Sequence, residues 1–333
     1  MEKHCGSMIS HGSFIISLDF EMMWGVKDIC TPEGYGQTNV KQVREVIERM
    51  LALFDKYDVH ATFAAVGLLF FKDKTQALKN LPCRLPKYTR RFLSPFEDDY
   101  IANIDDRYAD LYFASDIIDQ LQKHPNIELA THTFSHYNCW ADGQTAEDFE
   151  ADIKAALVAA ELFGIKAPKS IVFPRNNVAD NYLDICKQYG ITTYRGNARR
   201  FYARSSNAFV QLFQRFARFV DSYLNIGGPT SVNYNMLEGG EPANVPASRF
   251  LRPYNAKIGT FEPLKVRRIK NEILYAARNK ELYHLWWHPH NFGSDMEQNL
   301  NNLEKILAFY ADCHKNYGMQ SYTMSEFSNL INR

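Results

Sequence analysis

The sequence lacks several features that would tie it to particular protein classes. It has no charge excess, because 38 Lys and Arg residues balance 38 Asp and Glu residues, so no global field attracts nucleic acid or an anionic membrane. Its six cysteines are scattered without a Cys-x-x-Cys pair, which excludes a zinc ribbon and a disulfide-stapled secreted module. We therefore expect reduced thiols, a cytoplasmic protein and no nucleic-acid partner.

Long apolar runs and repeats are also missing. Residues 1–11 lack the apolar core of a signal peptide. The apolar run at 62–71 is too short to cross a bilayer, so no membrane span is predicted. The hydrophobic fraction of 46% is that of a globular protein. A chain of 333 residues suffices for one large α/β barrel or two ordinary domains.

Short apolar segments alternate with amphipathic ones along the chain. The apolar segments predict strands at 14–16, 60–66, 127–130, 170–173, 191–194 and 282–287. The amphipathic segments predict helices at 40–57, 111–123, 146–163, 180–189 and 299–314. Asn39 is a candidate helix cap, and Thr323 with Glu326 forms a capping box before a last short helix. This alternation favours a parallel α/β architecture, a barrel of about seven strands.

Two stretches interrupt the alternation. Residues 81–107 carry prolines and charges without a clear period. The second stretch contains an amphipathic segment at 208–224 and a Gly- and Pro-rich segment at 227–246. No linker divides the chain, so we predict a single domain, a catalytic barrel over residues 10–333, with insertions near 72–110 and 197–280.

Polar side chains follow the predicted strands where these end. Asp19 and Glu21 end the first strand, and alternation along a strand lets both face one site. His132 and His136 follow the strand at 127–130. One carboxylate with two histidines is the inventory of a metal site, which leaves the second carboxylate free to act as a base. Solvated carboxylates and hydrogen-bonded structural histidines are the alternative interpretation.

Three further strand ends carry groups capable of chemistry. Arg175 and Asn176 follow the strand at 170–173, Arg195 follows the next strand, and His288 and His290 follow the strand at 282–287. Active sites of parallel α/β proteins collect at the carboxyl ends of the strands. The convergence of so many polar strand ends therefore predicts one common site.

The order of four motifs resembles the polysaccharide deacetylase family, the NodB-like group known as carbohydrate esterase family four. The motifs are Ser-Leu-Asp-Phe-Glu at 17–21, His-Thr-Phe-Ser-His at 132–136, Phe-Pro-Arg-Asn-Asn at 173–177 and His-Pro-His-Asn at 288–291. The Asp-x-Glu form of the first motif is that of a subgroup with allantoinase-like members. The resemblance covers about residues 14–327 and implies a distorted (β/α)7 barrel with one divalent metal ion, most often zinc.

The resemblance also implies roles for individual residues. The family pattern makes Asp19 the general base. Glu21, His132 and His136 become the metal ligands. The usual pair of aspartates in the first motif is Asp-Phe-Glu here, so the longer Glu21 is a departure from the common ligand.

Further roles carried over from the family concern orientation and the acid. Arg175 would orient the Asp19 carboxylate, and His288 would be the general acid that protonates the departing amine, with His290 as its rival. We also predict substrate contacts, which involve Trp24, Asn176 and Arg195, although core packing is the alternative for the tryptophan. The tryptophan-bearing fourth motif of peptidoglycan and chitin deacetylases is not recognisable, so their substrates are not assumed.

These expectations combine into a function. We predict a metal-dependent hydrolase that removes an N-acetyl group from an amino sugar. The sugar would be a small or carrier-linked precursor of a surface polysaccharide. The alternatives are an allantoinase-like cyclic-amide hydrolase and a non-catalytic carbohydrate-binding relative. A glycosidase with two catalytic carboxylates is disfavoured, because it would leave the histidine pair without a role.

Overall fold

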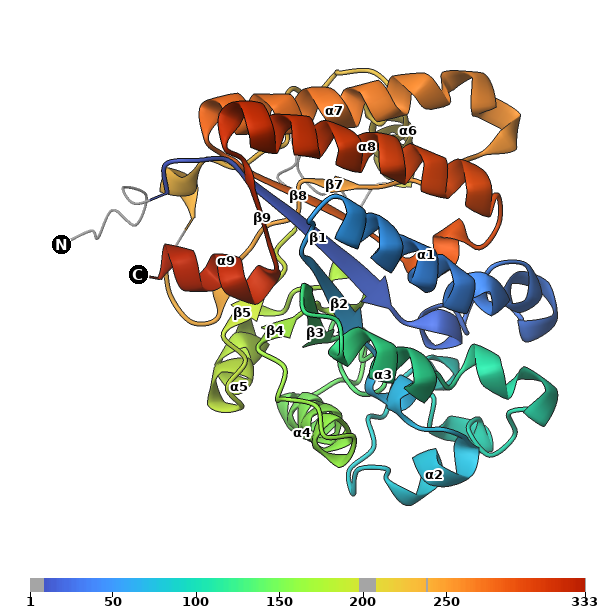
Figure 1. The fold of residues 1–333 in the computed structure, drawn as a ribbon. Helices are drawn as coiled ribbons and strands as arrows, with labels where there is room; N and C mark the ends of the chain where they lie inside the picture. The colour runs from blue at the N-terminus through green and yellow to red at the C-terminus, as the bar shows by residue number, and fades with distance from the viewer. Residues whose placement is uncertain (1–8, 198–207, 238, 333) are drawn as a thin grey trace.

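A curled parallel sheet forms the centre of the molecule (Figure 1). The computed structural model describes residues 9–197, 208–237 and 239–332. Within them the strand order is β6-β5-β4-β3-β2-β1-β8-β7, and β9 pairs with β1. The strands are β1 Ser13–Phe20, β2 Ala61–Ala65, β3 Ile127–Thr131, β4 Ser170–Ile171, β5 Thr193–Tyr194, β6 Ala243–Asn244, β7 Arg249–Phe250, β8 Leu282–Trp287 and β9 Gln320–Tyr322.

Helices cover the outside of the sheet. In Figure 1, α7 and α8 lie above β1 and β8, α1 lies beside β1, and α4 and α5 lie below β3, β4 and β5. The helices are α1 Val43–Lys56, α2 Lys74–Lys79, α3 Ser115–Gln122, α4 Ala146–Leu162, α5 Leu183–Gln188, α6 Ala208–Asp221, α7 Glu262–Asn279, α8 Met296–Tyr317 and α9 Met324–Ile331. Among the helices of the described residues, none combines the length and apolarity that a membrane crossing requires.

The first strand has both faces buried. All eight residues of β1 are buried, as is usual for parallel strands covered on both sides. Its even-numbered residues, from 14 to 20, pack in the outer core against the helices. Ile15 packs instead in an inner core with Ala64 and Val172. By alternation, Ser17 and Asp19 continue this inner row toward the carboxyl end of the strand.

One end of the barrel is closed by α9. Met324, Phe327 and Ile331 of this helix pack into the inner core beside Ile15. The capping box predicted for Thr323 and Glu326 is present and fixes the start of α9. Since Ile15 lies near the amino end of β1, α9 covers the end of the barrel opposite the carboxyl ends of the strands.

The predicted fold class, an α/β distorted barrel, is confirmed. The sequence predicts about seven strands, whereas β6, β7 and β9 bring the sheet to nine among the described residues. These strands have two or three residues each, too few to show a period. Because β6, β7 and α7 fall within 197–280, much of that predicted insertion belongs to the barrel; residues 198–207 and 238 lie outside the described part. The domain extent of 10–333 stays a prediction.

The start of α1 also differs from the prediction. A 3₁₀ turn at Val40–Gln42 precedes the helix, and the Asn39 side chain does not cap it. The Asn39 amide donates instead to the carbonyl of His290 and to the Ser294 hydroxyl, at 3.2 Å each. Asn39 therefore ties the beginning of α1 to the loop that follows β8.

Candidate active site

A buried arginine holds Asp19 inside the barrel. The Arg195 guanidinium donates to both carboxylate oxygens of Asp19, at 2.6 and 2.8 Å. It also donates to the Ser17 hydroxyl and to Oδ1 of Asn176. Its carbon Cζ lies 4.3 Å from the ring centroid of Trp286, in a cation–π contact. Two parallel bonds to a carboxylate fix its orientation as well as its charge.

The charges around Asp19 decide its ionisation. Burial by itself raises the pKa of Asp19, but the charge and the hydrogen bonds of Arg195 outweigh this effect and lower it. The carboxylate therefore stays ionised although only 2% of it is exposed.

The orienting contact predicted for Arg175 is wrong, because Arg195 makes it. Arg175 lies in the turn after β4 with a positive φ of 58°. Its exposed side chain extends to Asp28, with Nη2 2.6 Å from the carboxylate oxygen Oδ2. Both arginines follow neighbouring strands, and the sequence alone does not show which side chain turns inward.

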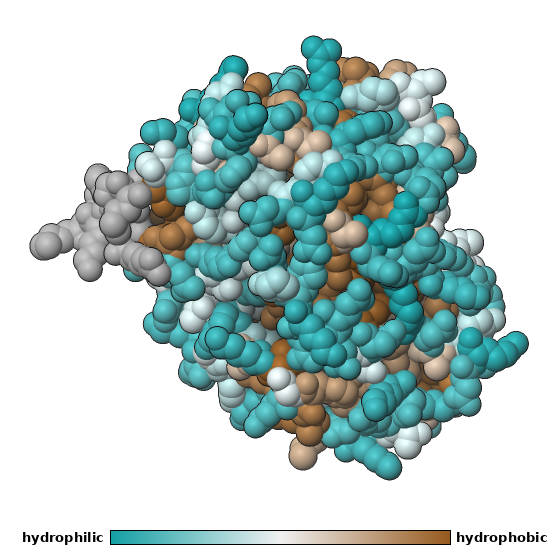
Figure 2. Space-filling model, viewed as in Figure 1, coloured by the Kyte–Doolittle hydropathy of each residue, from teal (hydrophilic) through white to brown (hydrophobic). Residues whose placement is uncertain are grey.

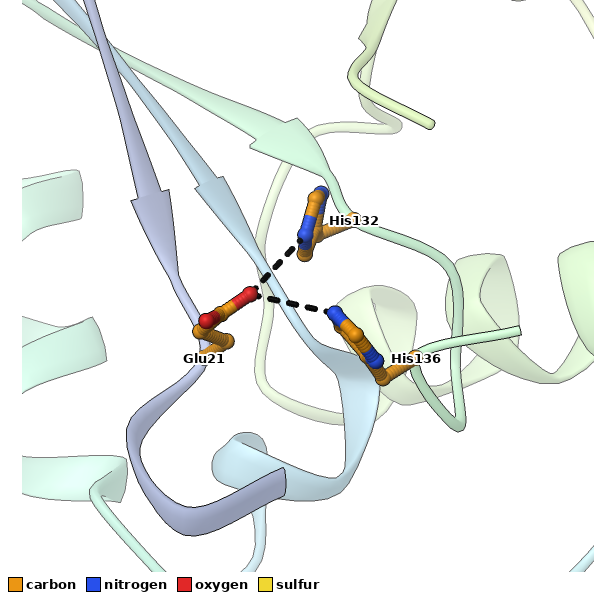
Figure 3. Close-up of side chains that lie close together, drawn as sticks. All are labelled: Glu21, His132 and His136. Atoms are coloured by element: carbon orange, nitrogen blue, oxygen red, sulfur yellow. Dashed lines mark ion pairs between the residues drawn. The ribbon is translucent and has the colours of Figure 1, made fainter. Parts of the chain in front are cut away.

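Glu21 and the two histidines form a compact cluster (Figure 3). One ligand atom from each lies within 4.8 Å of the others. Oε2 of Glu21 is 3.3 Å from Nε2 of His132 and 3.1 Å from Nε2 of His136. Figure 3 shows Glu21 approaching from the end of β1 and both imidazoles from the segment after β3. The structure thus brings together the three residues predicted as metal ligands.

The donor set of this cluster fits a cation. Nδ1 of His132 lies 2.8 Å from the Val172 carbonyl, so it carries the proton and leaves a lone pair on Nε2. That buried Nε2 has no hydrogen-bond partner and faces the Glu21 carboxylate. A carboxylate oxygen with two imidazole nitrogens is a usual set of protein ligands for zinc.

The electrostatics agree with a negatively charged Glu21 beside a neutral His136. Burial raises the pKa of Glu21, but the charge of His288 and the contacts with His132 and His136 lower it well below its usual value. Burial lowers the pKa of His136, and this effect exceeds the opposing influence of Glu21.

The Glu21 side chain, in its position in the cluster, leaves no room for a side chain at position 25. A Cβ atom on Gly25 would lie 2.0 Å from the carboxyl carbon of Glu21, far inside any allowed contact. The loop after β1 therefore folds directly over the Glu21 carboxylate, and Gly25 makes this close approach possible.

The loop that carries the histidines is held by a buried aspartate of α4. Asp152 accepts hydrogen bonds from the Phe134 amide at 2.6 Å, from the Ser135 amide and from the Ser135 hydroxyl. Thr133 and His136 have positive φ angles of 64° and 58°, which non-glycine residues rarely adopt. Burial raises the pKa of Asp152 to about 6. Asp152 thus stabilises a strained loop conformation.

Replacing Asp152 with asparagine should weaken the histidine cluster. The new amide group would set a donor against the donors of Ser135, so we expect a loss of about 1–3 kcal/mol in the free energy of unfolding. Bound metal should fall as well, measured by elemental analysis. Asp148→Asn is the control, because Asp148 lies on the same helix but pairs with Arg84. Equal metal loss in both variants would contradict a specific role for Asp152.

His288 lies at the edge of the site that solvent reaches. Its Nε2 is 3.6 Å from Oδ2 of Asp19 and 3.6 Å from Oε1 of Glu21. The His288 side chain is 22% exposed, against 6% or less for the two carboxylates. His290 is buried, with Nε2 4.0 Å from Glu21. Burial and the charge of His288 lower the pKa of His290 to about 3.

A short hydrogen-bond chain positions His288. The Tyr35 hydroxyl donates to Oδ1 of Asn291 at 3.2 Å, which turns the Asn291 amide toward Nδ1 of His288, also at 3.2 Å. Phe250 packs edge-on against the His288 ring, with the centroids 5.8 Å apart. These contacts direct Nε2 of His288 toward the two carboxylates.

The three predicted substrate contacts have different places in the structure. Trp24 is buried, donates to the Tyr112 carbonyl at 2.7 Å and packs among aromatic rings of the core, so it does not face a sugar. Arg195 is also buried, paired with the Asp19 carboxylate, so its side chain is not open to a substrate. Asn176 accepts from Arg195 and is partly exposed at the rim of the site, where substrate contact stays a prediction.

Several residues of the site escape sequence reasoning. Ser17 receives a bond from Arg195 and lies 2.8 Å from Nε2 of the buried His284. Asp152 has one detectable signal, since a carboxylate three positions after Phe149 lies on the apolar stripe of its helix. Nothing in the sequence singles out Asp28 as the partner of Arg175.

The comparisons with known proteins bear on this geometry. The model of the family described as polysaccharide deacetylase matches residues 32–194. This match includes the histidine pair but begins after Glu21 and ends before His288. Over this region the chain is similar to the polysaccharide deacetylase family, and the similarity supports a deacetylase, a hydrolase on a barrel fold. A comparison with curated proteins found no significant match.

Solved structures confirm the fold. A polysaccharide deacetylase described as putative, from Mycobacterium smegmatis, aligns with a TM-score of 0.59 at 12% identity, over 98% of this chain and 92% of the other. A structure described as Puue allantoinase aligns with a TM-score of 0.52 at 11% identity, over 96% of this chain and 89% of the other. At such identities these similarities establish the fold alone.

Proposed function

We propose that this chain is a metal-dependent hydrolase that removes an N-acetyl group from an amino sugar. The observation that carries the proposal is the cluster of Glu21, His132 and His136 beside Asp19 and His288. These groups provide, within one barrel end, ligands for a cation, a fixed carboxylate base and an accessible imidazole. The similarity to the polysaccharide deacetylase family supports the deacetylase class.

The ligand cluster and the base divide the first half of the reaction. Glu21, His132 and His136 would hold a divalent ion, with zinc favoured by the two nitrogen ligands. When bound, such an ion supplies Lewis acidity that polarises an acyl carbonyl and makes water a better nucleophile near neutral pH. Asp19, ionised and oriented by Arg195, accepts the proton that the attacking water loses.

His288 completes the second half of the reaction. An amide nitrogen leaves only when it is protonated, so a proton donor must stand on the side where the amine departs. His288 is partly exposed and lies 3.6 Å from Asp19, so its imidazole can pass a proton between the base and the leaving nitrogen. His290 is buried behind it and has no comparable access to a substrate.

Metal content tests the ligand cluster. We expect about one divalent ion per purified chain and loss of most of it in His132→Ala and in His136→Ala, because each change removes one of three protein ligands. Elemental analysis after dialysis measures this. His314→Ala is the control, since His314 lies on α8 and its Nδ1 donates to the Met319 carbonyl, outside the site. Full occupancy in the double variant of 132 and 136 would overturn the site.

The choice between His288 and His290 can be tested by the leaving group. His288→Ala should slow amide cleavage by about two to four orders of magnitude, as expected for a lost general acid. It should spare most activity on an activated ester, whose leaving group needs no proton. Steady-state kinetics on both substrates make the comparison.

His290→Ala is the matched variant, because it removes the same side chain two positions away. It should affect amide and ester mildly and to the same degree. An amide-selective loss in His290→Ala, with His288→Ala unselective, would exchange the two roles.

The substrate can be examined by the released product. Acetate release from N-acetylated amino sugars, free or linked to a phosphate, nucleotide or lipid carrier, is the expected activity. Ring opening of a cyclic amide without acetate release would favour the allantoinase-like alternative. A fully metal-loaded protein that binds sugars and turns over neither substrate would point to the non-catalytic relative.

A further inference from the structure

The helix α6 turns an apolar surface toward solvent. Leu212, Phe213 and Phe216 are each more than 60% exposed, and Phe219 is 38% exposed. We call these four side chains the α6 apolar face. Leu224 and Ile226, just beyond the helix, are also more than half exposed. In the view of Figure 1, α6 lies behind α7 and α8. The same view in Figure 2 shows a mainly hydrophilic surface, on which apolar residues form separate groups.

Buried ion pairs fix the end of this helix to the barrel. Oδ2 of Asp221 is 3.0 Å from Nη2 of Arg249, and Arg249 in turn pairs with Glu272 on α7. Oδ1 of Asp221 accepts the amides of Ile226 and Gly227. The helix is therefore anchored by its last residue, while the apolar face remains uncovered by the described part of the chain.

The anchored end of α6 lies beside the strand end that carries His288. The Arg252 guanidinium lies 5.8 Å from the Phe219 ring centroid and donates to the Ser222 hydroxyl at 2.8 Å. Arg252 follows β7, whose Phe250 packs against His288. A surface bound by α6 would therefore lie on the same side of the barrel as the exposed edge of the site.

The charges of the helix indicate what covers its apolar face. In sequence, α6 contains Arg215 and Arg218 and no acidic residue before Asp221, whose charge is already matched by Arg249. Amphipathic helices that lie in the interface of a membrane typically combine a phenylalanine- and leucine-rich face with basic residues. At 14 residues the helix is too short to span one.

We propose that α6 binds the surface of an anionic membrane, with the α6 apolar face inserted among the lipids. The balanced charge of the whole chain does not oppose this, since only the local charge acts within a Debye length. If the proposed deacetylase function holds, membrane binding also presents the site to an acylated sugar held on a lipid carrier; this last step rests on that function.

Sedimentation with lipid vesicles tests the proposal. The purified full chain should pellet with vesicles that contain phosphatidylglycerol and much less with vesicles of phosphatidylcholine alone, and added salt should weaken the binding. Phe213→Ser with Phe216→Ser should reduce binding at least about tenfold, because two apolar side chains no longer insert. Both side chains are exposed, so the fold should remain, as circular dichroism can verify.

A matched double variant provides the control. Phe92→Ser with Leu162→Ser removes two side chains of equal exposure, 57% each, away from α6, and should bind vesicles like the unmodified chain. The proposal would be overturned if the chain did not bind the vesicles that contain phosphatidylglycerol. It would also be overturned if both double variants lost vesicle binding equally. Dimerisation abolished by the α6 variant, without vesicle binding, would assign the face to a second copy instead.

The same assay separates this proposal from the proposed function. Asp19→Asn should bind vesicles as the unmodified chain does, because vesicle binding needs no turnover. Vesicle binding without any deacetylase activity would therefore contradict the proposed function alone. Deacetylase activity without vesicle binding would contradict the membrane proposal alone.

Discussion

Replacing Asp19 with asparagine is expected to lower kcat by two or more orders of magnitude, about the contribution of a general base. The substitution keeps the shape of the side chain. It leaves Arg195 one acceptor, where the unmodified Asp19 offers two oxygens. It removes the lone pair and the charge that take up the proton of the attacking water. Metal content should hold, because Asp19 is not among the clustered ligands. Steady-state kinetics and elemental analysis together measure the two quantities.

Glu21→Gln is the counterpart of this experiment. It also neutralises a carboxylate of the same site, two positions away, but it removes a charge that would face the metal. We expect it to lose metal affinity as well as rate. If Asp19→Asn empties the site and Glu21→Gln leaves it filled, the roles of base and ligand are exchanged.

Replacing Arg195 with alanine should have the largest effect on stability. Both Arg195 and Asp19 are buried, and removing one partner of a buried ion pair leaves the other charge uncompensated, at a cost of about 3–5 kcal/mol. Activity should fall together with stability, because the Asp19 carboxylate loses the fork that orients it. Chemical denaturation measures the free energy of unfolding.

Arg175→Ala separates this role from a general need for arginine. The Arg175 side chain is 38% exposed, whereas that of its partner Asp28 is 9% exposed. Solvent reaches the pair from the arginine side, so it should contribute less than the fully buried pair of Arg195 and Asp19. We expect a change below about 1 kcal/mol. A double variant of Arg195→Met and Asp19→Asn should be less destabilised than the sum of its parts, since it removes both buried charges. Similar losses in Arg175→Ala and Arg195→Ala would contradict the exchange of roles seen in the structure.

Much of the site could be predicted because its chemistry lies at strand ends. The apolar run before Asp19 and Glu21, and the one before His132, give strands whose order in a parallel sheet brings their carboxyl ends together. The structure has these strands as β1 and β3, separated only by β2. Local signals of this kind can be recognised in a single sequence, because each depends on a few consecutive residues.

Contacts between distant side chains could not be predicted in the same way. Arg175 and Arg195 follow neighbouring strands, yet only the turn geometry decides that Arg195 enters the barrel. The clamp of Asp152 on the histidine loop depends on how α4 packs. The strands β6 and β7 consist of two residues each, so tertiary pairing defines them and no periodic pattern does.

The pairing of β1 has a consequence for the order in which the protein is made. Ser13 aligns with Leu282 of β8 and with Gln320 of β9, so the strand that carries Asp19 leaves the ribosome long before two of its three neighbours. Contacts so distant along the chain form slowly, because a large loop must close first. Until then β1, apolar along most of its length, would present an unpaired edge. A nascent chain of this protein should thus depend on chaperones until β8 has emerged, and the Asp19 carboxylate should be among the last groups to reach its native place.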